Sequence, residues 1–60
     1  MRTGEHRKFQ VKVGEKAYVY RGKVLSISDG YVTIEDVKTG LISIRISEII
    51  TDEPYYKGQG

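Results

Sequence analysis

The sequence predicts an all-β fold, a small and strongly bent five-stranded barrel. Val, Ile, Thr, Tyr and Phe account for 23 of the 60 residues, whereas Ala, Leu, Met and Gln account for 6. Branched and aromatic side chains suit a pleated sheet better than a helix. Apolar residues also alternate with polar ones in short runs, and glycine-containing turns separate these runs. Together, the composition, the alternation and the turns predict several short strands joined tightly.

The chain length allows one small domain. Residues 1–7 are polar and basic without periodicity, so we expect a flexible basic arm there. Residues 8–53 carry the alternating runs and are expected to form the barrel. Residues 54–60 begin with the chain's single proline and are expected to form a C-terminal tail.

The first strand is expected to begin near Lys8, because Phe9, Val11 and Val13 then alternate with polar residues. A short turn at 14–16 ends it.

The second strand is expected to be long, from residue 17 to residue 27, and bent. Its apolar residues Val19, Val24 and Ile27 fall out of phase, so one straight strand cannot bury all three. Gly22 interrupts this run, and a strand glycine often marks a bulge or a barrel corner. We therefore expect the bend at Gly22 or soon after it.

The second half of the chain predicts three shorter strands. An Asp29-Gly30 pair, typical of tight hairpins because both residues tolerate positive φ, precedes a strand at 32–35. A turn at 36–40, with its glycine in the left-handed conformation, leads to the most regular alternation of the chain, at 42–46. A short helical turn or corner then precedes a brief fifth strand at 49–50. The inward residues of all five strands form the predicted core: Phe9, Val11, Val13, Val24, Ile27, Val32, Ile34, Ile42, Ile44 and Ile49.

Two segments carry a resemblance to a known family. Residues 20–36 place an aromatic residue two before a glycine, an aromatic residue at an acidic turn, and acidic residues at the end of a strand. This pattern resembles the first motif of Sm and LSm proteins. Residues 44–49, Ile-Arg-Ile-Ser-Glu-Ile, are similar to the second motif, Ile-Arg-Gly-x-x-Ile. The likeness covers residues 9–52, and the strand order and the bend agree with it. The same spacing also fits other SH3-like barrels.

The chain departs from that family in three places. The segment before Lys8 is too short for the N-terminal helix that usually opens the fold, so we expect none here. Ser28 replaces the motif aspartate of the RNA-contacting loop, and the motif asparagine has no clear equivalent. Ile46 stands where the second motif has glycine.

The resemblance implies a ring and an RNA-binding face. Family members form rings of six or seven subunits by pairing strand four of one subunit with strand five of the next, and they bind RNA through loop residues. By position, the matching contacts are Asp29, Tyr31 and Arg45. We also expect a homo-oligomer from the small core of this chain, because association buries further apolar surface. The expected interface residues are Ile46, Ile49 and Ile50.

Charge is unevenly distributed. Residues 1–23 hold seven Lys or Arg against two Glu, net +5, and residues 24–60 hold three against six acidic residues, net −3. The basic residues of the first part, Arg7 and Lys8 above all, are candidates for phosphate contacts, and Tyr18 and Tyr20 for base stacking. The alternative is that the lysines and arginines solubilise an exposed strand and the tyrosines pack on neighbouring strands. Head-to-tail association of the two charged halves is also open. The candidate nucleic-acid contacts are Arg7, Lys8, Asp29, Tyr31 and Arg45.

The residue types present argue against an enzyme or a metal protein. Cysteine is absent and His6 is the only histidine, which removes thiolate and multi-histidine zinc sites. The carboxylate pairs at 35–36 and 52–53 are adjacent residues, which point to opposite faces of a strand and cannot act as a dyad. No nucleophile, base and orienting residue form a set. We therefore expect no enzyme activity, no cofactor and no small-molecule substrate.

No membrane segment and no secretory signal is recognised in the sequence, so we expect a cytoplasmic protein without a membrane partner. Two function classes remain. The first is an Sm-like barrel that binds nucleic acid, RNA above all, as a homo-oligomer. The second is a structural or protein-interaction module with an SH3-like barrel and no nucleic-acid ligand.

Overall fold

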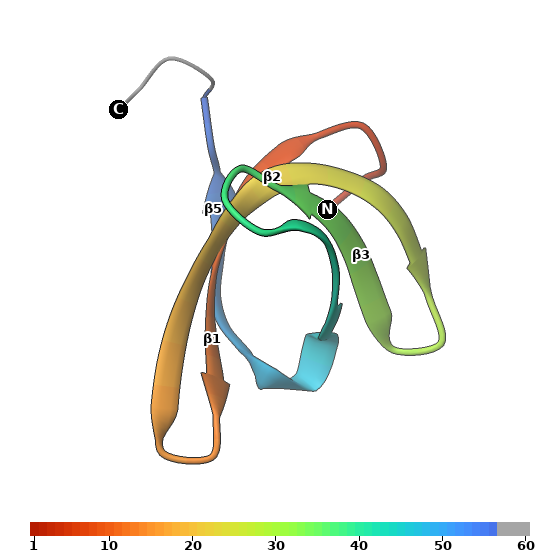
Figure 1. Cartoon of the computed structure of the whole chain (residues 1–60). Helices are drawn as coiled ribbons and strands as arrows, with labels where there is room; N and C mark the ends of the chain where they lie inside the picture. Colours follow the sequence, from red (N-terminus) through yellow and green to blue (C-terminus); the bar gives the residue numbers. More distant parts are fainter. Residues whose placement is uncertain (57–60) are drawn as a thin grey trace.

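The computed structural model describes residues 1–56 and contains five antiparallel strands in one sheet, in the order β4-β3-β2-β1-β5. The sheet curls strongly, as the ribbon in Figure 1 shows. The elements are β1 (His6–Val13), β2 (Lys16–Ser28), β3 (Tyr31–Asp36), β4 (Gly40–Arg45), a 3₁₀ turn η1 (Ile46–Glu48) and β5 (Ile49–Pro54). The predicted all-β fold of five strands is confirmed. In the part of the chain that the structure describes, no helix is long and apolar enough to cross a membrane.

Strand β2 arches across the whole sheet, as predicted. Its first part pairs with β1 and its second part, from Gly22 onward, pairs with β3. The register with β3 shifts between Val24 and Ser26, which leaves Leu25 as an extra residue. Such a bulge bends a strand and increases its twist. The bend therefore follows Gly22 by a few residues.

Gly22 is required for a different reason from the one expected. A Cβ atom at this position would lie 2.6 Å from the backbone carbonyl carbon of Glu35, and closer still to the carbonyl oxygen. The backbones of β2 and β3 approach so closely here that only a residue without a side chain fits.

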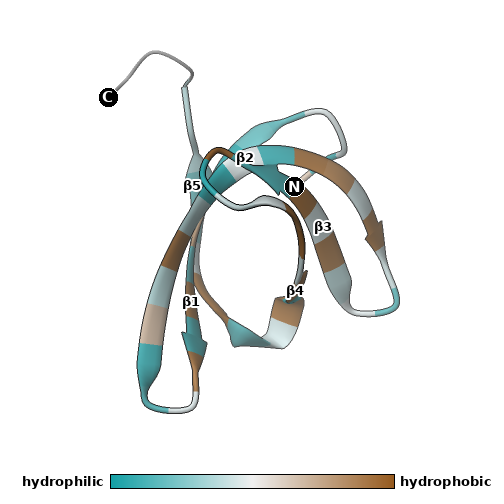
Figure 2. Ribbon diagram, in the orientation of Figure 1, coloured by the Kyte–Doolittle hydropathy of each residue, from teal (hydrophilic) through white to brown (hydrophobic). Residues whose placement is uncertain are grey.

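The core lies on the concave side of the sheet. Its buried residues are Phe9, Val11, Val24, Val32, Ile34 and Ile44, and Tyr20, Ile42 and Ile49 pack against them. Figure 2 shows the underlying pattern, in which hydrophobic bands alternate with hydrophilic ones along the strands.

The predicted burial of two core residues, Val13 and Ile27, is wrong. Val13 is 46% exposed and Ile27 is 40% exposed. Val13 ends β1 beyond the last residue that pairs with β5, and Ile27 lies on the part of β2 that has left β1. Val13 faces inward by alternation with Val11, and Ile27 faces inward because, after the bulge, it pairs with the buried Val32. No opposite wall of the barrel covers either side chain there.

The N-terminal segment joins the sheet earlier than predicted. Strand β1 begins at His6, two residues before the expected start at Lys8. The Gly4 N–H donates to the Val24 carbonyl at 2.7 Å, and the Val24 N–H donates to the Glu5 carbonyl at 2.8 Å. Strand β5 correspondingly extends through Pro54, one residue past the predicted barrel. Residues 57–60 of the predicted tail lie outside the described residues.

The predicted turn chemistry is confirmed. Asp29 and Gly30 have φ values of 52° and 77°, so both residues of the β2–β3 hairpin are left-handed, as an Asp-Gly turn of this kind requires. Gly40, expected to be left-handed, has φ 82°.

Asp36 closes the β3–β4 turn through a buried carboxylate. The side chain is 7% exposed and accepts hydrogen bonds at 2.9 Å from the backbone N–H groups of Arg21, Lys38 and Thr39, and one at 3.0 Å from the Thr39 hydroxyl. Burial alone would raise the pKa of Asp36, but the hydrogen bonds from Thr39, Lys38 and Arg21 outweigh it, and the pKa of Asp36 lies below its ordinary value. Asp36 therefore acts as a structural anion.

We expect Asp36→Asn to lower the free energy of unfolding by ~1–3 kcal/mol at neutral pH, because the amide would turn N–H donors toward the backbone N–H of Arg21. The pKa of Asp36 is depressed in the folded state, so the stabilisation by its carboxylate is present above the unfolded pKa of ~3.9 and is lost as the pH falls through the folded value. Urea unfolding at pH 7 and at pH 3 checks this. The difference in the free energy of unfolding between parent and variant should be smaller at pH 3 than at pH 7. An equal difference at both pH values would contradict the role of Asp36 as a charged carboxylate.

Candidate functional site

The two candidate contacts Tyr31 and Arg45 meet at one end of the barrel. Tyr31, the first residue of β3, lies directly opposite Arg45, the last residue of β4. The Arg45 Nη2 donates to the Tyr31 hydroxyl at 3.0 Å, and the guanidinium carbon lies 5.6 Å from the centroid of the ring. The hydrogen bond to Tyr31 holds the pKa of Arg45 above its ordinary value. A permanent cation and an aromatic ring thus form one exposed unit.

Asp29 belongs to the same end of the barrel. The Ile46 N–H donates to the Gly30 carbonyl at 2.8 Å, which ties the β2–β3 turn to η1. An open groove of about 570 Å³ runs between the turn and η1, and Asp29, Tyr31 and Arg45 all line it. The three positions assigned by resemblance to the two motifs are therefore brought together, although they come from segments far apart in the sequence.

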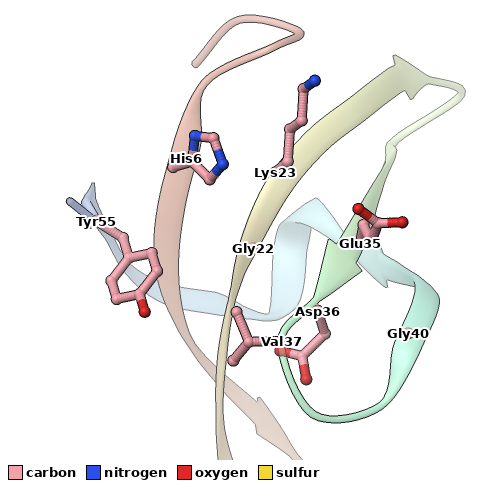
Figure 3. A pocket seen from close by; sticks show the side chains of 8 residues that line it. All are labelled: His6, Gly22, Lys23, Glu35, Asp36, Val37, Gly40 and Tyr55. Carbon is pink, nitrogen blue, oxygen red and sulfur yellow. The ribbon is translucent and has the colours of Figure 1, made fainter. Parts of the chain in front are cut away.

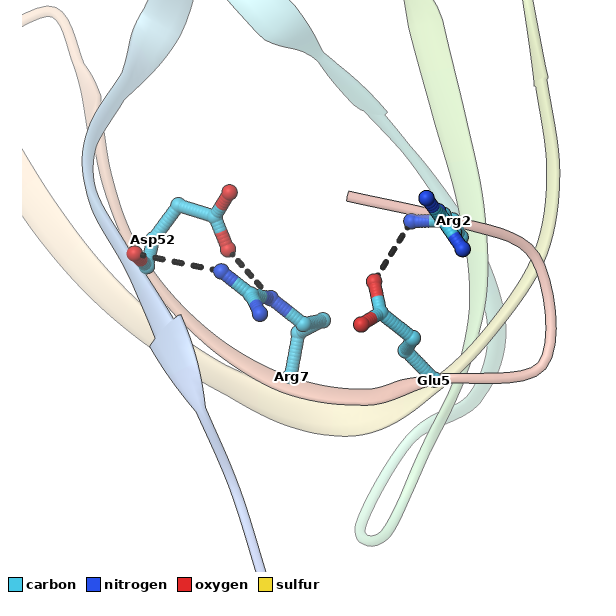
Figure 4. A network of polar contacts seen from close by, with 4 residues as sticks. All are labelled: Arg2, Glu5, Arg7 and Asp52. Carbon is cyan, nitrogen blue, oxygen red and sulfur yellow. Dashed lines mark hydrogen bonds and ion pairs between the residues drawn. The ribbon is translucent and has the colours of Figure 1, made fainter.

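Arg7 lies elsewhere and is engaged in the fold. Its Nε is 2.8 Å from Asp52 Oδ1, and its Nη2 donates to the Asp52 carbonyl at 3.4 Å (Figure 4). The Arg7 side chain is 15% exposed. The hydrogen bond to Asp52 raises the pKa of Arg7, against the opposing effect of burial. This ion pair joins β1 to β5 and leaves Arg7 little freedom to contact a ligand.

Lys8 points to the opposite face of β1 from Arg7, because successive strand residues alternate. Its Nζ lies 3.8 Å from Glu53 Oε1, and both side chains are well exposed. An exposed pair at this distance contributes little to stability and leaves Lys8 free to meet an anion. The candidate residues thus lie in three places. Asp29, Tyr31 and Arg45 line the groove, Lys8 lies on the outer side of β1, and Arg7 lies on the inner side in its ion pair with Asp52.

The register of β1 and β2 assembles a set of basic residues that sequence reasoning did not separate by face. Lys8 is directly opposite Arg21, and His6 is directly opposite Lys23. On β1, His6, Lys8 and Lys12 alternate with the buried Phe9 and Val11 and therefore point to the convex side of the sheet. On β2, Arg21 and Lys23 lie directly opposite Lys8 and His6 and point to the same side. We call this surface the basic face: His6, Lys8, Lys12, Arg21 and Lys23.

The tyrosines of β2 do not join the basic face. Tyr18 pairs with Val11 and Tyr20 pairs with Phe9, so both lie on the concave side. Their rings stack with centroids 6.2 Å apart. Tyr20 packs on the core, as the alternative interpretation of these tyrosines expected.

A second hollow lies at one end of the basic face. It has a volume of about 490 Å³ and is lined by His6, Lys23, Val37 and Tyr55, among others. Figure 3 shows the rings of His6 and Tyr55 near one another, with Lys23 on the neighbouring strand. Sequence reasoning missed this hollow because Tyr55 was assigned to the tail.

The predicted interface residues lie at an edge of the sheet. β4 and β5 are the two outer strands of the sheet. Ile50 is 53% exposed and Ile46 is 38% exposed, whereas Ile49 packs on the core. Within residues 1–56, no group of three or more His, Asp or Glu side chains is placed to hold a metal ion.

The chain matches no protein-family model, and no curated protein or solved structure gives a match. The resemblance to Sm and LSm proteins therefore depends on the two motifs and the strand arrangement alone.

Proposed function

We propose that this chain is an Sm-like small barrel that binds single-stranded nucleic acid, RNA in particular, in the groove beside Tyr31 and Arg45. The observation that carries the proposal is the exposed pair of aromatic ring and guanidinium, joined by a hydrogen bond of 3.0 Å at the edge of an open groove. Unpaired bases of RNA stack on aromatic rings and on guanidinium planes.

Each side chain has a distinct role in this proposal. The Tyr31 ring offers a face for one base. Arg45 donates one hydrogen bond to Tyr31. The remaining N–H groups of its planar guanidinium donate to a phosphate or to the edge of a base. Asp29 holds the left-handed turn that shapes the groove.

The proposal includes assembly into a homo-oligomer. β4 and β5 end the sheet on its two sides, and an unpaired strand edge is a template for pairing with another chain. The exposed side chains of Ile46 and Ile50 lie beside these edges. In such an assembly the groove would be repeated once in every subunit.

We expect a fluorescently labelled oligouridine to bind the parent protein and Tyr31→Ala to weaken this binding about 5- to 150-fold, because stacking one base on an aromatic side chain contributes ~1–3 kcal/mol. Tyr31→Phe keeps the ring and should lose far less. Arg45→Ala should also weaken binding, while light scattering shows an unchanged oligomer. Fluorescence anisotropy in low salt measures the affinities. The proposal would be refuted if the parent protein, at high micromolar concentration and low salt, did not bind the labelled oligonucleotide.

A protein-interaction module is the second candidate, and a specific observation favours it. Val13 and Tyr18, near the tip of the β1–β2 hairpin, expose apolar surface beside a cleft of about 240 Å³ that is lined in part by Val13 and Ile42. Such surface suits another protein better than a polyanion. Concentration-dependent association without any oligonucleotide binding would favour this candidate.

A further inference from the structure

We propose that the basic face, His6, Lys8, Lys12, Arg21 and Lys23, is a track for the phosphodiester backbone of a single-stranded nucleic acid. The inference depends on the proposed function and extends it to a second surface, on the convex side of the β1–β2 ribbon and away from the groove. Three independent features of this surface carry it.

The first feature is the pairing of like charges. Lys8 lies directly opposite Arg21. Like charges at directly opposite positions of an antiparallel pair destabilise the sheet. In the described residues, Arg21 has no side-chain hydrogen bond or ion pair to offset this repulsion. A bound polyanion would offset this repulsion, because both side chains would then lie close to a negative charge.

The second feature is the border of the track. Glu53 on β5 lies beside Lys8, and Glu35 on β3 lies beside Lys23. The positive surface is therefore only two strands wide and has a carboxylate on each side. A polyanion that crosses the strands would meet these carboxylates, whereas one that runs along β1 and β2 would avoid them. From His6 to Lys12 the track is ~20 Å long, at 3.2–3.4 Å per strand residue.

The third feature identifies the polyanion as a nucleic acid. The hollow at the His6 end of the track has the Tyr55 ring on one side and Lys23 on the other, and Glu35 and Asp36 also line it (Figure 3). The Asp36 carboxylate already accepts hydrogen bonds from Arg21, Lys38 and Thr39. An aromatic ring close to the Lys23 cation suits a base and its phosphate. An acidic peptide would use the cations but would not need the ring.

The test compares the salt dependence of oligouridine binding in the parent and in Lys8→Gln/Arg21→Gln. For single strands, each phosphate that a cation neutralises contributes ~0.7 to the slope of log affinity against log salt. The double variant neutralises two phosphates fewer, so its slope should be smaller by ~1.4, and its affinity should fall about sevenfold less than that of the parent between 50 and 200 mM salt. Lys38→Gln, in the β3–β4 turn, is the matched control and should leave the slope unchanged.

A stability readout excludes misfolding as the cause. Lys8→Gln/Arg21→Gln removes a pair of facing like charges and loses only the exposed ion pair of Lys8 with Glu53, so its melting temperature should equal or exceed that of the parent. A variant that failed to bind only because it unfolded would melt lower instead.

A second arm tests the role of the ring. Tyr55→Ala should weaken oligouridine binding about fivefold or more, since one stacked base contributes at least ~1 kcal/mol. The same variant should bind inorganic polyphosphate as well as the parent does. Equal losses for both ligands would overturn the assignment of the ring to a base.

The failures of the two proposals are distinguishable. If the parent binds oligouridine and the double variant keeps the parental slope, the track is refuted and the groove stands. If the parent binds polyglutamate on this face but no oligonucleotide, the track belongs to an acidic protein and the nucleic-acid assignment fails. A parent that binds none of these polyanions refutes both proposals.

Discussion

Replacing Gly22 with alanine is expected to remove roughly a third or more of the free energy of unfolding. The added Cβ would fall 2.6 Å from the carbonyl carbon of Glu35 and closer to its oxygen. These are backbone atoms, so no side chain can rotate away, and β3 would have to separate from β2 to make room. We expect a loss of at least ~3 kcal/mol, at or above the upper end of ordinary overpacking. A 60-residue domain holds only ~3–9 kcal/mol in total.

Gly30→Ala is the matched control for this prediction. A Cβ at Gly30 would meet nothing within 4 Å, and the only strain is its left-handed φ of 77°, which costs ~1–2 kcal/mol for a residue with a side chain. Circular dichroism and urea unfolding of both variants give the comparison. If Gly22→Ala lost no more stability than Gly30→Ala, the close approach of β2 and β3 would be wrong.

Local pattern was enough to predict most of the fold. Alternation placed Phe9, Val32 and Ile34 on the inward face, and all three are buried. The Asp-Gly pair predicted a hairpin with two left-handed residues, because its requirement for positive φ is local. Burial at the strand ends is not local. The bulge at Leu25 turns Ile27 to the inward face, but whether its side chain is covered depends on where β1 leaves β2.

Residues of the candidate site could be predicted only where they matched a position of one of the two motifs. Tyr31 and Arg45 were assigned through the resemblance and do meet. The ion pair of Arg7 with Asp52 joins residues 45 positions apart, and no local signal indicates it. The basic face depends on the register of the β1–β2 hairpin, which places Lys8 opposite Arg21. A shift of one residue in that register would move one strand's cations to the other face.

Ile34→Ala is expected to lower the free energy of unfolding by ~2–5 kcal/mol, the usual range for emptying a buried isoleucine site. Ile34 is fully buried on β3, between β2 and β4, and it pairs with Val24 and Ile42. Neighbouring strands on both sides keep the backbone from collapsing into the space, so the cavity term is added to the transfer free energy of the deleted atoms.

Ile27→Ala deletes the same atoms from a strand residue that is 40% exposed. It is therefore the control, because the chemical change and the change in strand propensity are the same and only the burial differs. Part of the Ile27 side chain is already in water, so less apolar area is lost and the cavity opens to solvent; we expect less than ~1.5 kcal/mol. Urea midpoints of the two variants at equal protein concentration, chosen so that any subunit association is matched, give the difference directly. Equal losses would mean that Ile27 is covered in solution, and because the curl of the sheet leaves it uncovered within one chain, the cover would have to come from a second subunit.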